Sequence, residues 1–300
     1  MVSLFKSIAA MLALGLGSLL SRLPLRLQRS CAAAVGAAAY RVAGRRRRIA
    51  QTNLRICFPE WSETQRTEVA KLFFKQFSIA LFDLFWLWRE PQEEIIRRVR
   101  VSGLEHLQAA DSSRLGPVIV LAPHFLGIDA GGTRLQIDRM LVCLYSNQSI
   151  PAMDRWMLEG RNRFANAILI SRREGIGRLA RILRDGTTAH FSSDMDFGRN
   201  GAVFAPFFGE PAATPTSLVR LARMAKATVV PMVTRLTPEG YEARFYPGWR
   251  YDEADEQDLA TCVTDLNQKI EGWIREDPSQ YLWTHRRFKT RPPGLSSVYS

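Results

Sequence analysis

The sequence has few of the residues that build metal sites and disulfide frameworks. Its 300 residues include four cysteines and four histidines, and no two cysteines form a Cys-x-x-Cys pair. Structural zinc sites usually show such closely spaced ligands, and disulfide frameworks are typical of short secreted chains. The sequence therefore predicts no metal site and no disulfide scaffold. We also expect no bound cofactor, and a reducing compartment.

Acidic residues are missing from the first part of the chain. None precedes Glu60, whereas the same stretch contains the arginine run Arg45–Arg48 and several isolated basic residues. Over the whole chain, lysine and arginine number 41 and aspartate and glutamate 29, which gives a net charge of +12. Such a one-sided basic segment attracts polyanions, and these can be nucleic acid or an anionic membrane surface.

The N-terminal apolar run is shorter than a membrane span needs. Residues 7–20 are apolar or small throughout, whereas a helix that crosses a bilayer needs roughly 20 residues. A signal peptide is disfavoured because arginines follow the run and no small-x-small cleavage site stands after Ser21. We expect residues 4–20 to span the membrane or to insert at its interface, with the following residues cytoplasmic by the positive-inside rule. The alternative is a buried apolar helix.

A second apolar region, residues 72–88, is rich in aromatic side chains. Its apolar residues recur at spacings of three and four, which predicts a helix, but they extend nearly all round it. Such a helix is either deeply buried or partly in lipid, and tryptophans such as Trp86 and Trp88 favour the water–lipid boundary. Core packing and a membrane-facing helix both remain open.

Short apolar runs alternate with helical stretches from about residue 100 onward. The runs that predict buried strands cover residues 117–122, 140–145, 167–171, 187–193 and 228–235. Helices are predicted at about 130–136, 176–184, 216–227 and 256–276. This alternation predicts an α/β fold with a central mixed, mostly parallel sheet flanked by helices. The N-terminal helical membrane-associated segment would precede it.

The loop after the first predicted strand carries a candidate catalytic pair, His124 and Asp129. Chemistry in open α/β sheets gathers at the carboxyl ends of the strands, and His124 follows such an end directly. An acyl transfer needs a base that takes the proton of the attacking hydroxyl, and the ordinary pKa of histidine suits this role. A carboxylate can hold the imidazole in one tautomer, so we expect Asp129 to orient His124.

The spacing of this pair is weak evidence by itself. His106 and Asp111 have the same spacing, but they lie in a polar connection with no apolar strand before them. We therefore interpret His106 and Asp111 as accidental. A structural role for His124 is the competing interpretation.

Two further loops carry candidate substrate-binding residues. Asp194 and Asp196 follow the strand at 187–193, and could bind Mg²⁺, orient a basic group, contact a sugar or simply form a turn. Arg161 and Arg163 lie between two predicted strands, where a guanidinium suits phosphate oxygens or a carrier protein. A solvated basic face explains the arginines equally well.

Taken together, these motifs resemble those of the bacterial lipid A biosynthesis acyltransferases. The resemblance covers most of the chain in the family's order, through residues 46–62, 122–129, 193–209, 213–235 and 280–292. It implies three parts: an N-terminal anchor at 1–45, an acyltransferase domain at 46–292 and a C-terminal tail at 293–300.

The resemblance also implies an activity and its partners. The donor would be an acyl-acyl carrier protein, and the acceptor a hydroxyl on an acyl chain of an anionic, Kdo-bearing lipid A precursor. The enzyme would lie on the cytoplasmic face of the inner membrane. His124 and Asp129 match the catalytic motif, in which many members carry Glu at the second position. Asp194 and Asp196 match an acidic pair, and Arg161 and Arg163 fall in a basic stretch.

Two rival interpretations lead to different tests. The first is an acyltransferase that acts on another lipid, such as a lysophospholipid, an ornithine lipid or a glycolipid. The second is a membrane-tethered protein that binds nucleic acid through Arg45–Arg48, which predicts salt-dependent binding. The aromatic-rich helix and the loop of His124 argue against the second, so we expect no nucleic-acid partner.

Because no serine or cysteine stands in a nucleophile-elbow context, we expect direct attack without a covalent acyl-enzyme.

Overall fold

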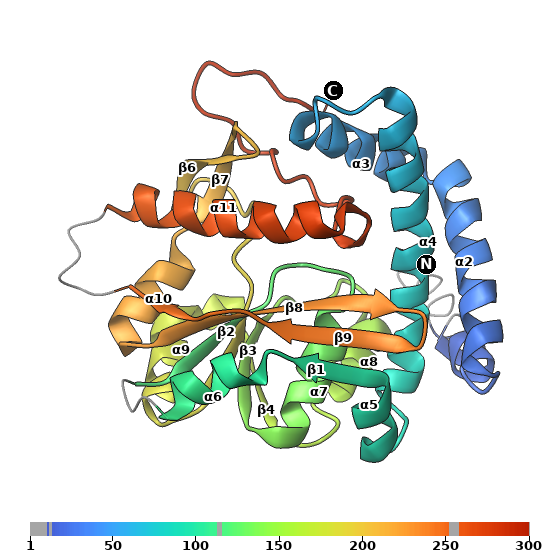
Figure 1. The fold of residues 1–300 in the computed structure, drawn as a ribbon, viewed down its shortest axis with the longest axis horizontal. Helices are drawn as coiled ribbons and strands as arrows, with labels where there is room; N and C mark the ends of the chain where they lie inside the picture. Colours follow the sequence, from blue (N-terminus) through green and yellow to red (C-terminus); the bar gives the residue numbers. More distant parts are fainter. Residues whose placement is uncertain (1–10, 12–13, 113–115, 252–257, 300) are drawn as a thin grey trace.

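The structure is a computed structural model that describes residues 11, 14–112, 116–251 and 258–299. A central sheet runs through the molecule in the order β1-β9-β8-β2-β5-β3-β4, and β10 pairs with β8 (Figure 1). Its strands are β1 (Val99–Ser102), β2 (Val118–Leu121), β3 (Leu141–Tyr145), β4 (Ala167–Ser171), β5 (Thr188–Phe191), β8 (Thr228–Thr237), β9 (Gly240–Phe245) and β10 (Trp249–Arg250).

Most neighbouring strands of this sheet are parallel. The pairs β1–β9, β2–β8, β2–β5, β3–β5 and β3–β4 are parallel, whereas β8–β9 and β8–β10 are antiparallel. The predicted mixed, mostly parallel sheet is therefore confirmed. Sequence patterns did not predict β1 and β9, nor the separate hairpin of β6 (Ala202–Phe207) and β7 (Glu210–Pro215).

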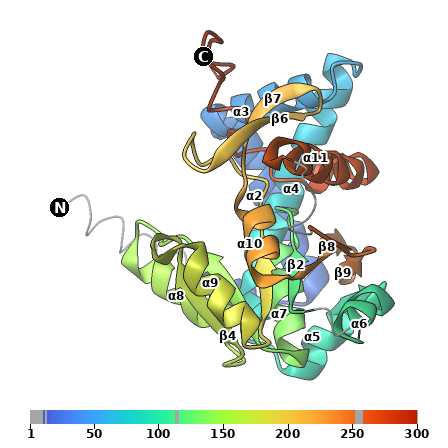
Figure 2. The ribbon, with the colours of Figure 1, turned by 90° about the vertical axis from the view of Figure 1, so that its left-hand side faces the viewer.

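Helices cover both faces of the sheet. They are α2 (Leu25–Val42), α3 (Gly44–Cys57), α4 (Glu63–Leu87), α5 (Gln92–Arg98), α6 (Leu104–Ser112), α7 (Ile128–Asp138), α8 (Pro151–Arg161), α9 (Gly175–Arg184), α10 (Ser217–Ala225) and α11 (Leu259–Glu276), with 3-10 turns η1 (Arg172–Glu174) and η2 (Pro278–Gln280). Figure 2 shows α8 and α9 beside β4, and α5 and α6 toward β9. The sequence did not predict α8.

The central strand β2 shows how the two faces are filled. Every residue of β2 is buried. Ile119 and Leu121 pack in the large core with residues of α9, α10 and α11, whereas Val118 and Val120 pack in a smaller core with residues of α6 and α7. Because successive side chains of a strand point to opposite faces, a strand buried on both faces must be apolar throughout. That requirement makes this strand recognisable in the sequence.

The long helices α2 and α4 lie side by side at one end of the sheet (Figure 1). Arg29 of α2 forms a buried ion pair with Asp83 of α4, with Nη2 and Oδ2 2.6 Å apart, and Tyr241 of β9 donates a hydrogen bond to the same carboxylate at 2.9 Å. Arg29 also donates to the carbonyl oxygen of Thr237 at the end of β8. These contacts bind the N-terminal helices to the sheet.

The aromatic-rich region predicted as a helix belongs to α4. Ser62 caps this helix and forms a reciprocal capping box with Gln65. Phe73, Phe74 and Trp86 are buried, so core packing accounts for much of the aromatic content of α4. The described residues hold no helix with the length and apolar character that crossing a membrane requires. Of the predicted anchor segment 4–20, residues 14–20 are helical, and residues 4–10, 12 and 13 lie outside the described residues.

Candidate active site

His124 and Asp194 are brought together by two adjacent parallel strands. In the pairing of β2 with β5, Leu121 lies opposite Phe191. His124 follows Leu121 by three residues, and Asp194 follows Phe191 by three. Both side chains therefore leave the sheet at the same carboxyl-terminal edge, where α/β folds place their chemistry.

The carboxylate of Asp194 uses both oxygens to hold His124. Oδ1 lies 2.6 Å from the ring nitrogen Nδ1, and Oδ2 accepts a hydrogen bond from the backbone N–H of His124 at 2.8 Å. Because an ionised carboxylate only accepts hydrogen bonds, Nδ1 carries the proton and Nε2 is left as the basic nitrogen. Burial alone would raise the pKa of Asp194, but the charge and hydrogen bonds of His124 outweigh it and lower that pKa to about 2.

Asp129 has a different partner from the one predicted. It lies in the first turn of α7 and forms an ion pair with Arg161 at the end of α8. Arg161 Nε is 2.8 Å from Oδ1, and Nη2 is 3.3 Å from Oδ2. Although burial opposes it, the guanidinium of Arg161 lowers the pKa of the Asp129 carboxyl. The prediction that Asp129 orients the His124 ring is therefore wrong.

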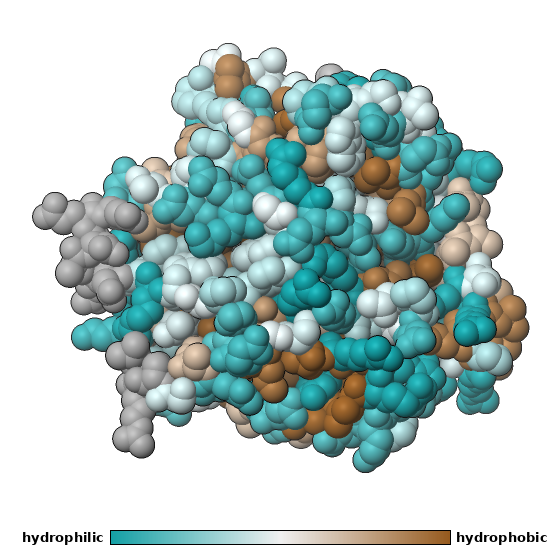
Figure 3. All heavy atoms as spheres, viewed as in Figure 1, coloured by the Kyte–Doolittle hydropathy of each residue, from teal (hydrophilic) through white to brown (hydrophobic). Residues whose placement is uncertain are grey.

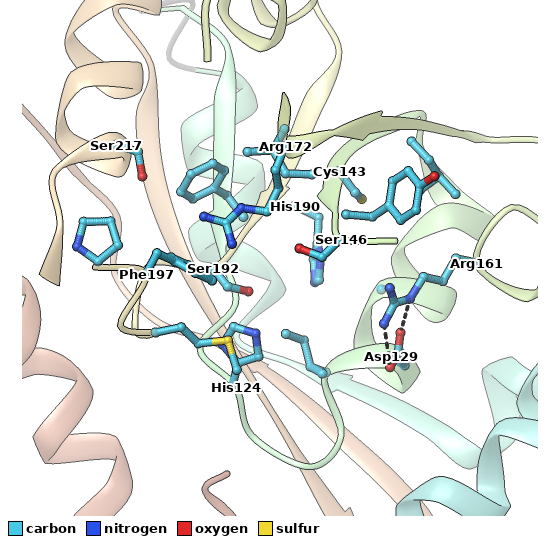
Figure 4. A pocket seen from close by; sticks show the side chains of 18 of the residues that line it. His124, Asp129, Cys143, Ser146, Arg161, Arg172, His190, Ser192, Phe197 and Ser217 are labelled. Carbon is cyan, nitrogen blue, oxygen red and sulfur yellow. Dashed lines mark hydrogen bonds and ion pairs between the residues drawn. The ribbon is translucent and has the colours of Figure 1, made fainter. Parts of the chain in front are cut away.

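The physical reason lies in how the chain leaves β2. Gly127 ends the strand-exit loop, and α7 begins at Ile128, so Asp129 lies on a helix whose first turn faces α8. The carboxylate beside His124 comes instead from Asp194 in the loop after β5, 70 residues further along the chain. Figure 4 shows the separation: His124 points into the pocket at one side, and the Asp129–Arg161 pair lies at the other.

His124, Asp129 and Arg161 line a common pocket of about 310 Å³ at the carboxyl ends of β2, β5 and β3. Apolar side chains form much of its wall: Ile128, Leu144, Leu169, Phe191, Met195 and Phe197. Such a wall suits an alkyl chain, while the charged residues at its edge suit a polar head. The pocket thus combines a base with room for an acyl group.

His190 of β5 also lines this pocket, and the sequence reasoning did not single it out. Its ring lies against Gly132 of α7, where an added Cβ would be 3.7 Å from Nε2. Burial lowers the pKa of His190 to about 4, and its buried Nε2 has no hydrogen-bond partner within the described part of the chain. A histidine within a predicted buried strand was the available signal.

Arg163 and Asp196 are bound by the protein itself. Arg163 donates to the carbonyl oxygens of Leu87 and Glu90. Asp196 is buried and accepts hydrogen bonds from the backbone and hydroxyl of Thr290, at 2.6 and 2.8 Å. Neither residue lines the pocket, so their geometry gives no support to the predicted substrate contacts. Asp196 instead ties the segment after η2 to the loop of Asp194.

No group of three His, Cys, Asp or Glu side chains suited to a metal is found among the described residues. Cys143, which lines the pocket, is partly buried, and desolvation raises the pKa of its thiol to about 12. That thiol therefore stays protonated at neutral pH and is a poor nucleophile.

A histidine held by a carboxylate at a strand end, beside a pocket with an apolar wall, is the arrangement expected of an acyltransferase. The chain matches the family of bacterial lipid A biosynthesis acyltransferases over residues 2–290, and it belongs to that family. It is 32% identical to the lipid A biosynthesis lauroyltransferase of Escherichia coli over 291 residues, which cover 96% of this chain and 94% of the relative.

Other members of the family transfer different acyl chains. The lipid A biosynthesis palmitoleoyltransferase of Escherichia coli is 33% identical, covering 88% of this chain and 86% of the relative. The lipid A biosynthesis myristoyltransferase of the same organism is 28% identical, covering 89% and 82%. The chain is thus an acyltransferase of lipid A biosynthesis, within a family whose members differ in the acyl chain that their names specify.

Proposed function

We propose that the chain transfers a fatty acyl group from an acyl-acyl carrier protein to a hydroxyl of a Kdo-bearing lipid A precursor. The observation that carries this proposal is the His124 imidazole, held at Nδ1 by Asp194 and facing the pocket. The family membership supports the lipid A acceptor. The thioester donor rests on the resemblance of the sequence motifs, and the apolar wall of the pocket is compatible with its acyl chain.

In this proposal His124 is the general base. Its Nε2 takes the proton of the acceptor hydroxyl as that oxygen attacks the thioester carbonyl carbon. An ester bond forms, the carbon–sulfur bond breaks, and the thiolate of the carrier leaves with the proton from the imidazolium. Asp194 holds the required tautomer and stabilises the imidazolium.

Asp129 and Arg161 act on the opposite side of the pocket in this proposal. The two-point ion pair fixes the guanidinium of Arg161 at the pocket wall. A fixed positive charge there stabilises the negative charge that develops on the thioester oxygen. Asp129 is therefore proposed as a positioning residue that acts through Arg161.

The proposed site of action is the cytoplasmic face of the inner membrane. Support comes from the N-terminal helices, where exposed apolar side chains occur beside basic ones. The exposed apolar residues there are Leu16, Leu19, Leu27, Val35 and Val42. In Figure 3 apolar residues appear at the edge of the molecule where Figure 1 draws α2. Apolar and basic groups on one helical surface are typical of contact with an anionic lipid interface.

A transfer assay tests the proposed function. Purified protein is incubated with labelled acyl-acyl carrier protein and a lipid A precursor, and the product is identified by mass spectrometry. The expected product is heavier by one acyl chain, and His124→Ala should abolish it. His106→Ala is the matched control and should keep full activity, because His106 lies on α6 outside the pocket. Transfer only to a lysophospholipid, or undiminished transfer by His124→Ala, would contradict the proposal.

A further inference from the structure

Arg172 lies at the pocket that holds His124, stacked on an aromatic ring. Its guanidinium carbon is 3.3 Å from the centroid of the Phe197 ring, and both residues line the pocket. Arg172 begins η1 after β4, whereas Phe197 lies in the loop after β5. Figure 4 shows the guanidinium of Arg172 beside Phe197, across the pocket from the Asp129–Arg161 pair.

The charge of Arg172 has no counterion within the part of the chain that the structure describes. Glu174, the nearest carboxylate in the sequence, accepts a hydrogen bond from the backbone of Ser171 and pairs with Arg178. The other arginine of the pocket, Arg161, forms an ion pair with Asp129. Among the described residues, Arg172 therefore presents a positive charge at the pocket that no carboxylate pairs with.

The stacking fixes the orientation of this free cation. Phe197 is 45% exposed, and its ring offers a face to the guanidinium of Arg172. A guanidinium that lies flat on a ring keeps the N–H groups at its edge free, and these can bind two oxygens of one anion. Arg172 is exposed at the pocket, so an anionic group of a substrate can reach these N–H groups.

We propose that Arg172 binds a phosphate group of a substrate through two hydrogen bonds while the acyl group lies at His124. This inference rests on the proposed function, in which both substrates carry phosphate. The phosphate would belong to the phosphopantetheine arm of the carrier protein or to the glycolipid acceptor. In either case Arg172 anchors one end of a substrate at the pocket, and Phe197 positions Arg172.

Steady-state kinetics of Arg172→Gln test this role. Charge-assisted hydrogen bonds to an anion predict a KM about 10- to 100-fold higher for the substrate that carries the bound phosphate. The value of kcat should stay within about threefold, because the proposed contact of Arg172 is with a phosphate group and not with the reacting hydroxyl or the thioester. Arg172→Lys, which keeps the charge but loses the two-point geometry, should lie between wild type and Arg172→Gln.

Phosphate-free substrates identify which substrate carries the phosphate that Arg172 binds. Acyl-phosphopantetheine is compared with acyl-pantetheine as donor, and the acceptor is compared with its dephosphorylated form. For the wild type, removal of the bound phosphate from the substrate should raise the KM by the same factor as the substitution Arg172→Gln. For Arg172→Gln, removal of that phosphate should raise the KM no further. The proposal would be overturned if Arg172→Gln left the KM of both phosphorylated substrates unchanged. It would also be overturned if Arg172→Gln raised the KM of the phosphate-free substrates as much as that of the phosphorylated ones.

Control variants separate this role from a general effect of charge. Arg178→Gln removes a neighbouring arginine of α9 that does not line the pocket, and it should leave both KM values unchanged. Phe197→Leu removes the ring under the guanidinium and should raise the same KM several-fold.

A binding measurement makes the inference independent of turnover. Phosphopantetheine and glucosamine phosphate are titrated calorimetrically into wild type, Arg172→Gln and Arg178→Gln. We expect one of the two probes to bind wild type and Arg178→Gln, and to lose at least tenfold in affinity for Arg172→Gln. Equal affinities in all three proteins would overturn the role of Arg172 even if acyl transfer proceeds. Absence of acyl transfer with this binding pattern intact would count against the proposed function alone.

Discussion

Replacing Asp194 with Asn should disable His124 without removing it. Both carboxylate oxygens of Asp194 accept hydrogen bonds, one from the ring Nδ1 and one from the backbone N–H of His124. An asparagine side chain offers one oxygen and one NH₂ group. If the oxygen serves the backbone N–H, the NH₂ group faces Nδ1 and forces the proton onto Nε2. If it serves Nδ1, the NH₂ group meets the backbone N–H, and two donors face each other.

The first arrangement removes the base and the second is unfavourable, so we expect a large loss of activity. The same kind of tautomer error in a histidine–aspartate pair lowers kcat on the order of 10⁴-fold. We predict a fall in kcat of about 10³- to 10⁴-fold for Asp194→Asn, which corresponds to about 4 to 5 kcal/mol of barrier. The KM values should change much less, because Asp194 lies behind His124 and does not line the pocket.

The assay is acyl transfer at saturating donor, combined with ¹⁵N NMR of the imidazole in labelled protein. Asp194→Asn should shift the His124 ring to the tautomer protonated at Nε2. Asp129→Asn is the matched control: it releases Arg161 and lowers activity, but it should leave that tautomer unchanged. A kcat for Asp194→Asn within threefold of wild type, or a changed tautomer in Asp129→Asn alone, would refute the reasoning.

Three further predictions concern stability, each measured by chemical denaturation. Burial lowers the pKa of His190 and His285 to about 4, so the unfolded chain binds protons between about pH 6.5 and pH 4 that the folded chain does not. Acidification through this window should cost up to about 3 kcal/mol per histidine, and an unchanged urea midpoint from pH 7 to pH 5 would contradict it. Asp83→Ala leaves Arg29 buried without its carboxylate and should lower the free energy of unfolding by about 3 to 5 kcal/mol. A decrease below about 1 kcal/mol would mean that water compensates the charge of Arg29. Gly36→Ala would bring a Cβ to 2.4 Å from a backbone oxygen of α4 and should cost about 1 to 3 kcal/mol, whereas wild-type stability would show that α2 can move away.

Sequence patterns predicted β2 well because this central strand is buried on both faces, and the predicted run 117–122 exceeds it by one residue at each end. The predicted run 167–171 coincides with β4, an edge strand that is partly buried and apolar along most of its length. Strand β9 was missed because the predictions relied on continuous apolar runs. It alternates polar with apolar residues, with Glu242 and Arg244 between Tyr241, Ala243 and Phe245, which is the pattern of a half-buried strand. Its neighbours in the sheet, β1 and β8, are not revealed by any local pattern.

The sequence singled out part of the residues of the candidate site and fewer of its contacts. His124 could be found because an apolar strand leads directly to it, and Asp194 was selected for the same reason at the end of β5. Their pairing depends on β2 and β5 being neighbours in the sheet, although β3 and β4 lie between them in the sequence. The pairing of Asp129 with Arg161 likewise depends on where α8 packs, and α8 was not predicted.

The role of His124 as the general base can be tested through the mass of the acceptor. A lipid A precursor is incubated with acyl-acyl carrier protein and either wild-type protein or His124→Ala, and the masses of both products are measured by mass spectrometry. We expect wild type to add the mass of one acyl chain in an ester linkage and His124→Ala to add nothing. An acceptor acylated equally by both proteins would contradict the claim that His124 is the base.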